Sequence, residues 1–292
     1  MKTINKRKIM KYVEPMLYIL PALLFFGLFT YYPFIKTIVS SFFKCNSYGV
    51  MRSFVGFANY AKVLRDKEFW SAVKNTLVFT GITVPASTII ALFFAIISSR
   101  PRKYSAVYET MYALPMAISA SVCCMIFQLM YNPSLGILNE ILHTKINWLG
   151  DSHWTMISIS FIATWMNIGY NYIFLLAAVR SIPDEIIESA ELDGARGLLK
   201  VVRIYIPLIS PTLFFVICNG IAREMMMSTL IMVLSDYAHN ADVSTIVSYM
   251  YKQCILSQNY NRGYPAAVLA FLLTFIFLLI GFKMENKSVQ YE

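Results

Sequence analysis

Apolar residues along this 292-residue chain are gathered into long unbroken runs, separated by shorter polar segments. Five runs contain no Asp, Glu, Lys or Arg: Met16–Ile35, Asn75–Ser99, Thr110–Asn139, Trp154–Val179 and Gly263–Phe282. A sixth run, Ile204–Ser235, is interrupted only by Arg223 and Glu224. A helix needs roughly 20 apolar residues to cross the hydrocarbon core of a bilayer, and each run is long enough. The pattern therefore predicts an all-α membrane protein with six transmembrane helices.

The segments around these runs carry patterns of their own. The first run contains the bulky LLFFGLFTYYPF and no small-residue cleavage site, so we expect an uncleaved membrane anchor. Apolar residues from Phe57 to Leu64 recur at helical spacing, which predicts a short amphipathic helix at the outer membrane surface. NPSLG at residues 132–136 predicts a turn that ends the third span. The polar and aromatic residues 236–262 are expected to lie over the outer surface.

Composition agrees with a bilayer as the solvent of this chain. Its mean hydropathy is +0.57, and 14% of its residues are charged, whereas soluble domains have about a quarter. The formal net charge of +9 is compatible with nucleic-acid binding, so the placement of the basic residues has to decide its meaning.

Basic residues gather on one side of the predicted membrane domain. With six spans, both termini share a side with the loops at 100–108 and 180–203. That side holds Lys2, Lys6, Arg7, Lys8, Lys11, Arg100, Arg102, Lys103, Arg180, Arg196, Lys200, Arg203, Lys283 and Lys287. The positive-inside rule makes it cytoplasmic, and the seven basic residues from Lys36 to Lys74 count less because they lie in a longer translocated segment. The charge is a topology signal, and no nucleic-acid partner is predicted.

Cysteine and histidine residues predict no metal site. The five cysteines lack metal-ligand spacing, and Cys123, Cys124 and Cys218 fall inside predicted spans, where cysteine is an ordinary small packing residue. Cys45 and Cys254 are both expected outside the membrane, and the sequence leaves open whether they form a disulfide. The three histidines are scattered and lie near no paired acids, so no catalytic cluster is predicted either.

A short acidic segment, ESAELDGA at residues 188–195, stands out between the fourth and fifth runs. Upstream of it, Ser181 and Asp184 fit a capping box, which predicts the start of a helix. Asp193-Gly194 should end this helix, because glycine adopts the left-handed geometry of a helix terminus.

A second short helix is predicted to follow the glycine. Asp193 is placed to cap it, and it would run through Ala195–Ile204 towards Pro207. The local pattern thus predicts two helices joined by a sharp elbow on the cytoplasmic side. An ordinary amphipathic loop at the membrane surface is the alternative that these local signals leave open.

The same residues resemble the EAA loop of ABC importer permeases. That loop reads Glu-Ala-Ala, two residues, Asp-Gly-Ala and then Ile-x-x-Pro, and here ESAELDGA is followed by IYIP at 204–207 and by Pro211. RSIPDEIIE, FVGFANY, NTLVFT and GILNEIL are similar to the carbohydrate-uptake branch, the maltose and glycerol-3-phosphate permeases. The resemblance runs from about residue 15 to 283. Ser189 replaces the usual first alanine, and Val201 replaces a common aromatic residue.

This resemblance implies a type I ABC importer permease fold with both termini cytoplasmic, in a bacterial plasma (inner) membrane. It implies a second permease subunit, two ABC ATPase subunits and an extracellular solute-binding protein as partners. The loop, at about 181–206, would dock on the ATPase and transmit its closure. The coupling residues implied by the motif are Glu188, Ser189, Ala190, Asp193, Gly194 and Ala195.

ATP and magnesium would then be bound by the partner ATPase and not by this chain. A Walker A loop needs Gly-Lys followed by Ser or Thr, and the dipeptide Gly-Lys does not occur in the sequence. The chain is therefore expected to be no enzyme and to bind no cofactor.

The middle of the fourth run contains an unusual polar cluster, WMNIGYNY at 165–172. Asn167, Tyr170 and Asn171 share one helix face, where amides and an aromatic ring suit a carbohydrate path. The alternative is that the amides tie helices together inside the membrane.

Arg223 and Glu224 are the other candidates for contact with substrate. We expect them about 24 Å beyond Pro207 along the fifth helix, where a charge must face protein or water. Successive residues point about 100° apart, so the two do not simply neutralise each other. They would line a polar cavity or pair with the second permease subunit. AREMMMST departs here from the usually aromatic family sequence.

The prediction is a single permease domain, residues 1–292, importing a sugar or oligosaccharide. Glycerol-3-phosphate or another acidic solute is the alternative with the same architecture. An ion-driven secondary transporter is the alternative from another class. It is disfavoured because such proteins usually have broken helices near the membrane midplane, whereas this chain has one docking-type cytoplasmic loop instead.

Overall fold

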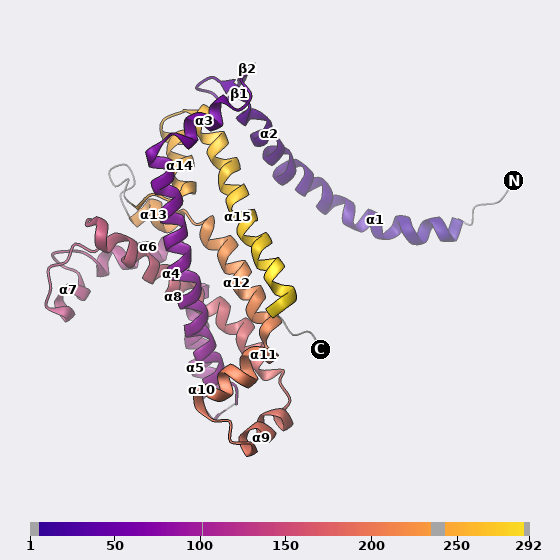
Figure 1. The fold of residues 1–292 in the computed structure, drawn as a ribbon, viewed down its shortest axis with the longest axis vertical. Helices are drawn as coiled ribbons and strands as arrows, with labels where there is room; N and C mark the ends of the chain where they lie inside the picture. Colours follow the sequence, from indigo (N-terminus) through magenta and orange to yellow (C-terminus); the bar gives the residue numbers. More distant parts are fainter. Residues whose placement is uncertain (1–5, 101, 235–242, 289–292) are drawn as a thin grey trace. The chain divides into compact units, whose positions relative to one another are not determined.

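The computed structural model describes residues 6–100, 102–234 and 243–288, which are mostly helical (Figure 1). It divides into two compact units. One joins the chain up to Arg65 to Lys252–Val268, and the other comprises Asp66–Tyr251 and the chain from Leu269 onward. Both units are therefore discontinuous in sequence.

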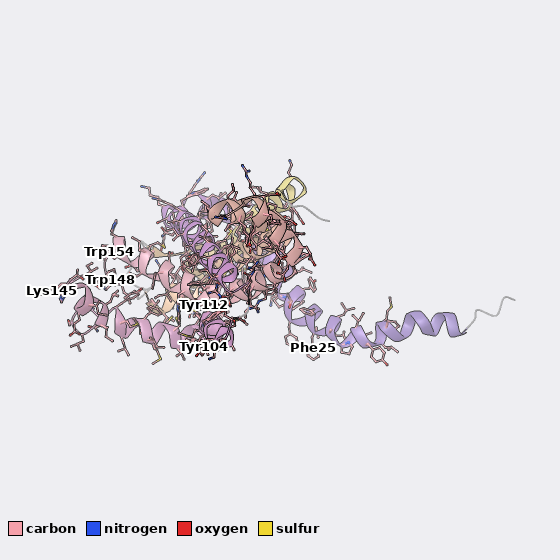
Figure 2. All side chains as sticks on the ribbon, turned by 90° about the horizontal axis from the view of Figure 1, so that it is seen from below. Phe25, Tyr104, Tyr112, Lys145, Trp148 and Trp154 are labelled. Carbon is pink, nitrogen blue, oxygen red and sulfur yellow. The ribbon has the colours of Figure 1, made fainter. Side chains whose placement is uncertain are left out.

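The first unit begins with a long exposed helical run. α1 (Lys6–Phe26), the π-helical η1 (Gly27–Tyr31) and α2 (Tyr32–Ser41) follow one another without a break. Pro15–Ser41 is apolar enough to cross a membrane, in agreement with the first predicted span, and its apolar window is not buried inside the unit. Phe25, for example, is exposed on this run (Figure 2).

A small β-hairpin follows, which the sequence did not predict. β1 (Phe43–Cys45) and β2 (Met51–Phe54) pair antiparallel, with Phe43 opposite Phe54. Asn261, near the start of α15 (Tyr260–Ser288), bonds to the hairpin through both ends of its side-chain amide. Its Oδ1 accepts from the backbone nitrogen of Cys45 at 2.8 Å, and its Nδ2 donates to the Cys45 carbonyl at 3.0 Å.

The predicted amphipathic helix is present as α3 (Ala58–Leu64). Tyr60 and Val63 are buried, and the Tyr60 hydroxyl lies 2.6 Å from Ser41 Oγ. Phe57 and Leu64, assigned to the same apolar face, are exposed, so the buried face is narrower than predicted. The unit also contains the π-helical η5 (Lys252–Leu256). Cys45 and Cys254 are both free thiols.

In the second unit, two long helices pack along each other: α4 (Lys67–Ile97) and α8 (Ser152–Arg180) (Figure 1). Asp66 and Asp151 cap them, each accepting a hydrogen bond from a first-turn backbone nitrogen. At 1.5 Å per residue, both are longer than the roughly 30 Å hydrocarbon core. They confirm the second and fourth predicted spans.

The third and fifth predicted spans are bent. α5 (Ser105–Ala113) and the 3₁₀-helical η2 (Leu114–Ala117) precede α6 (Ala120–Met130), which is turned by 99°. α10 (Gly197–Lys200), η3 (Val201–Tyr205) and α11 (Ile206–Leu208) precede α12 (Ser210–Met225), turned by 81°. The described residues thus hold four helices able to cross a membrane, or up to six if each bent pair is one span. The third and fifth predicted spans are therefore present as helices, each with a bend that the apolar pattern did not predict.

Shorter helices complete the second unit: α7 (Ile137–Leu142), α9 (Asp184–Leu192), α13 (Thr229–Leu234) and α14 (Ile246–Tyr251). The predicted turn at residues 132–136 is confirmed, with Asn132 Oδ1 accepting from the backbone nitrogens of Ser134 and Leu135. Of the segment 236–262, residues 236–242 lie outside the described ranges.

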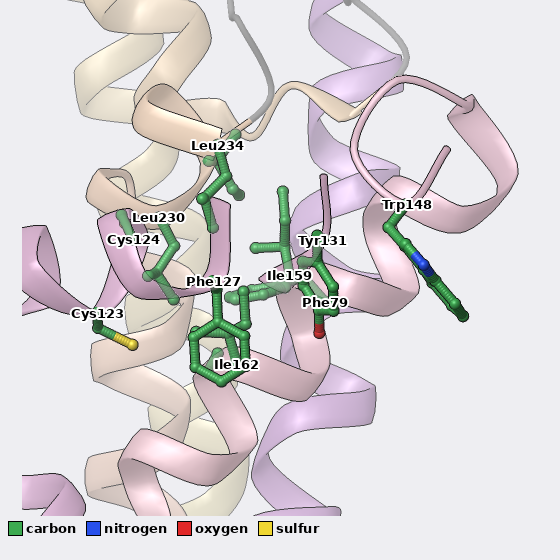
Figure 3. Packing of buried hydrophobic residues seen from close by; sticks show 12 residues of the cluster. Phe79, Cys123, Cys124, Phe127, Tyr131, Trp148, Ile159, Ile162, Leu230 and Leu234 are labelled. Atoms are coloured by element: carbon green, nitrogen blue, oxygen red, sulfur yellow. The ribbon is translucent and has the colours of Figure 1, made fainter. Parts of the chain in front are cut away.

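Two clusters of buried apolar side chains hold the second unit together. The first joins α4, α6, α8 and α13 (Figure 3) and contains Phe79, Cys123, Cys124, Phe127, Tyr131, Trp148, Ile159, Ile162, Ala163, Leu230, Ile231 and Leu234. The second contains Ala91, Ala95, Tyr172, Leu175, Leu176, Val179, Ile187, Tyr205, Ile209 and Val216. Since Ile187 lies on α9 and Tyr205 on η3, the second cluster fastens the acidic segment to α4, α8 and α12.

Candidate functional site

The acidic segment forms a helix that ends in a sharp elbow, as predicted. Gly194 directly follows the last turn of α9 and has φ of 83°, a left-handed conformation that residues with a Cβ rarely adopt. Ala195 N donates to Ala190 O at 2.9 Å, and Gly194 N donates to Glu191 O at 3.1 Å. This pair of hydrogen bonds is a Schellman motif, which satisfies the last carbonyls of the helix.

The flanks of the elbow differ from the prediction. The second helix begins at Gly197 rather than Ala195, because Gly197 also has a positive φ, 53°, and delays the restart. Arg196 occupies the cap position without a side-chain hydrogen bond, so the prediction that Asp193 caps this helix was wrong. The capping box was also wrong: α9 starts after Pro183, and Ser181 Oγ donates to Ala178 O instead.

The elbow buries one side and exposes the other. Ile187 and Ala190 are buried beneath α9, whereas Glu188, Ser189 and Asp193 are exposed. Glu188 also lines a hollow of about 410 Å³ together with Arg100, Arg180 and Tyr205. Two large apolar side chains are left uncovered at the tip: Leu192 is 89% exposed and Leu198 is 78% exposed.

Charged side chains hold the elbow at its base. Lys200 Nζ lies 2.6 Å from Glu191 Oε1, and Arg100 Nη2 lies 3.7 Å from the same oxygen. The hydrogen bond from Lys200 lowers the pKa of Glu191, and the positive charges of Lys200 and Arg100 act in the same direction. These contacts link the two arms of the elbow to each other and to the end of α4.

Four of the five substrate-path candidates meet at one place between α8 and α12. Asn167 Nδ2 donates to Glu224 Oε1 at 2.9 Å and to Ala163 O at 2.8 Å. Glu224 is only 1% exposed. The guanidinium carbon of Arg223 lies 4.6 Å from the ring centroid of Tyr170, a cation–π contact. Arg223 and Glu224 therefore have separate partners, as their angular separation predicted.

Asn167, Tyr170 and Arg223 line a cavity of about 170 Å³. Because α12 begins at Ser210, after the bend, Arg223 lies about 20 Å along the helix. The expected length of about 24 Å was counted from Pro207 along one straight helix, and the 81° bend between α11 and α12 interrupts that helix.

Asn171 does not join this cavity. Its Nδ2 donates to Ser87 Oγ of α4 at 3.2 Å, and its side chain is buried between the helices. A four-residue spacing puts two side chains on one face, but their χ angles and neighbours decide whether they meet one ligand. Asn171 therefore follows the alternative interpretation, an amide that ties two helices together.

The remaining cavity wall comes from residues that sequence reasoning missed: Pro115, Met116, Ile118, Ala163, Met166 and Met227. η2 can approach α8 this closely because residue 169 is a glycine. A Cβ there would lie 2.9 Å from Ala113 O and 3.2 Å from Met116 N. The glycine inside WMNIGYNY and the Leu-Pro before Met116 were the available signals.

Comparisons of this chain with known proteins identify its family. The family model described as "Binding-protein-dependent transport system inner membrane component" matches residues 75–285, which include the elbow and the cavity. The permease protein UgpA of the sn-glycerol-3-phosphate transport system of Agrobacterium fabrum is 27% identical over 283 residues, covering 96% of this chain and 97% of the relative. A probable ABC transporter permease protein of Pyrococcus horikoshii is 30% identical over 271 residues, covering 90% and 92%.

A solved structure shares the fold. A chain of a bacterial ABC transporter involved in the import of the acidic polysaccharide alginate superposes with a TM-score of 0.85, at 22% identity, over 97% of this chain and 98% of that chain. The family match confirms the resemblance drawn from the EAA-like segment. The chain belongs to the family of binding-protein-dependent transport system inner membrane components.

Proposed function

We propose that this chain, residues 1–292 acting as one permease domain, forms half of the translocation pathway of an ATP-driven importer. The observation that carries the proposal is the elbow of α9. It is fastened to α4, α8 and α12 through Ile187 and Tyr205, and it presents uncovered side chains at its tip. A partner that moved the elbow would move these helices with it.

The partner at the elbow is an ABC ATPase subunit. Glu188, Ser189 and Leu192 make the contact, Ala190 and Ala195 close the Schellman motif, and Gly194 makes the turn, while Asp193 is the exposed C-cap residue of α9. ATP and magnesium belong to that subunit. The complete importer would contain two ATPase subunits, a second, different permease chain and an extracellular solute-binding protein, in the inner membrane of a bacterium. Each bent helix pair serves as one span, which gives six spans with both termini in the cytoplasm.

The solute is a sugar, an oligosaccharide or a related polyol ester. UgpA is named for sn-glycerol-3-phosphate, and the structural neighbour is named for alginate. The cavity lined by Asn167, Tyr170 and Arg223 is the solute contact in this half of the pathway. The hydrogen bond that Asn167 donates to Glu224 fixes the position of the Asn167 amide.

An ion-driven transporter is a weaker alternative. Broken helices are typical of ion-driven transporters, and this chain has two bent helix pairs, so helix breaks do not argue against this alternative. Family membership and the elbow favour the ATP-driven importer, because an ion-driven transporter has no use for a docking surface of this kind. Co-purification of an ATPase subunit with the tagged chain separates the two.

Gly194→Val tests the coupling role. An added Cβ at Gly194 meets no atom within 4 Å, so the only penalty is the left-handed backbone, which costs a β-branched residue at least 1–2 kcal/mol. We expect a variant that reaches the membrane but loses ATP-coupled uptake. Gly81→Val is the matched control, because Gly81 is equally unobstructed and lies inside α4. Normal uptake by Gly194→Val would contradict the proposal that the elbow couples ATP hydrolysis to transport.

A further inference from the structure

The guanidinium of Arg223 is the least satisfied polar group in the cavity between α8 and α12. Its Nε and Nη2 atoms are buried and have no hydrogen-bond partner among the described residues. Among the described residues, Arg223 also forms no ion pair with a carboxylate. A buried charged donor without an acceptor carries a desolvation penalty, which a ligand oxygen would remove.

Neighbouring side chains hold the guanidinium without using its donors. The guanidinium carbon lies 4.6 Å from the Tyr170 ring centroid, and a cation–π contact supplies no oxygen acceptor for the N–H groups. Glu224 is next in sequence but forms no ion pair with Arg223 among the described residues: its Oε1 accepts from Asn167, and it is not part of the cavity wall. Arg223 therefore keeps two buried N–H donors without an acceptor beside the cavity, although the neighbouring Glu224 interacts with its charge.

The rest of the wall narrows the chemistry of the ligand. Apart from Arg223, Asn167 and Tyr170, the cavity is lined by methionine, isoleucine, proline and alanine. A guanidinium presents a planar fork of donors that matches the paired oxygens of a carboxylate or phosphate. Asn167 and the Tyr170 hydroxyl suit hydroxyl groups nearby, and the volume of about 170 Å³ limits the ligand group to a small one.

We propose that Arg223, held against Tyr170, is an anion subsite of the translocation pathway, which takes the carboxylate or phosphate of a small sugar or polyol. The proposal rests on the proposed function, because it assumes that the solute passes this cavity. It goes further by assigning charge selectivity to a residue of the permease itself, beyond any selection made by a solute-binding protein.

The test uses the complete importer, co-purified with its partners and reconstituted in proteoliposomes with the binding protein. Four labelled probes form two pairs: glycerol 3-phosphate against glycerol, and digalacturonate against galactobiose. The phosphate and carboxylate pairs distinguish the two sources of negative charge. We expect uptake of at least one anionic probe and not of its neutral counterpart.

Variants of Arg223 and Tyr170 test the subsite directly. Loss of charge-assisted hydrogen bonds should lower uptake of the anionic probe roughly tenfold to a hundredfold in Arg223→Gln, and less in Arg223→Lys, which keeps the charge. Tyr170→Leu should also lower uptake of the anionic probe, and by more than Tyr170→Phe, which keeps the ring beside Arg223 and loses only the hydroxyl. Arg52→Gln, at an exposed position of β2, removes the same charge elsewhere and should change nothing.

Three outcomes overturn the proposal: anionic uptake by Arg223→Gln at the wild-type rate, equal uptake of both members of each pair, or no uptake of either anionic probe. Complex assembly and basal ATP hydrolysis are measured for every variant. If Arg223→Gln fails to assemble, the contrast between Tyr170→Leu and Tyr170→Phe decides. Failure of the proposed function looks different, since then no ATPase co-purifies and no solute is imported in response to ATP.

Discussion

Gly169 lies where η2 comes closest to α8, and the surrounding atoms leave no room for a side chain. In Gly169→Ala the new Cβ would lie 2.9 Å from the Ala113 carbonyl oxygen, so η2 must shift. We expect a loss of about 1–3 kcal/mol in stability, seen as a lower unfolding temperature of the purified complex in nanodiscs. Gly81→Ala, with no atom within 4 Å, should be neutral or stabilising. Equal melting of the two variants would contradict this role.

Glu191 makes the elbow sensitive to acid. Its pKa is lowered by the hydrogen bond from Lys200, so the folded loop favours the carboxylate. The stabilisation is therefore present above the ordinary pKa of 4.5 and is lost as the pH falls through the lowered value. A spin label on Leu198→Cys should become more mobile in this window. In Glu191→Gln the label should already be mobile at pH 7, and a further rise on acidification would argue against Glu191 as the titrating group.

At the scale of elements, Arg180 joins the ends of three helices. From the end of α8 its Nη2 donates to Glu109 Oε1 of α5 at 2.6 Å and to Ser98 O at the end of α4 at 2.8 Å. Both charged side chains are half-buried. The second core cluster and the elbow lie directly beside this junction, so its stiffness affects how motion of α9 reaches α4 and α5.

Exchanging the charges of Arg180 and Glu109 separates the energetic contribution of their ion pair from that of the hydrogen bonds that Arg180 donates to backbone carbonyls. Arg180→Glu and Glu109→Arg should each lower the melting temperature and the number of solutes imported per ATP. The double variant should recover part of both, with a coupling energy of about 0.5–3 kcal/mol. Recovery is partial because an introduced glutamate cannot donate to the Ser98 carbonyl. Additive losses in the double variant would show that the pair does not act as a unit.

Straight helices were predictable from the sequence, and bent ones were not. α4 and α8 follow from unbroken apolar runs, because a helix that crosses a bilayer needs little more than length and hydropathy. The breaks before α6 and α12 leave no trace in hydropathy, since Ser119 and Ile209 are acceptable anywhere in such a run. Ser119 does accept a hydrogen bond from Val122 N as a helix cap, and a serine at this position is a weak sequence signal for the start of a helix.

The candidate site was predictable in the same uneven way. Gly194 was recognisable because a left-handed helix end almost requires glycine. The charges and amides on α8 and α12 drew attention because they are costly inside a membrane. Met116 and Pro115 were not recognisable, because nothing local says that η2 folds back against Gly169. The sequence could not decide between the two interpretations of Asn171 for the same reason: its partner Ser87 lies on another helix.

At the scale of the whole molecule, the exposed apolar tip of the elbow predicts a surface that binds the ATPase subunit. Leu192 is 89% exposed, and burying a leucine against a partner gains about 1.5–3 kcal/mol. Leu192→Ser should therefore weaken binding of the ATPase subunit roughly tenfold or more in a titration, without changing the melting temperature of the chain. Leu135→Ser is the control, since Leu135 is 88% exposed in a different turn. Equal binding by the two variants would exclude the tip from the docking surface.

The two hydrogen bonds between Asn261 and Cys45 set an order of events during synthesis. They join residues 216 positions apart, and the first unit closes only when Lys252–Val268 is present. Until residue 261 has been synthesised, the backbone N–H and C=O groups of Cys45 therefore lack these two hydrogen bonds. The first unit is thus among the last parts of the chain to be completed, and a nascent chain arrested before residue 261 would lack the side chain that joins the hairpin to α15.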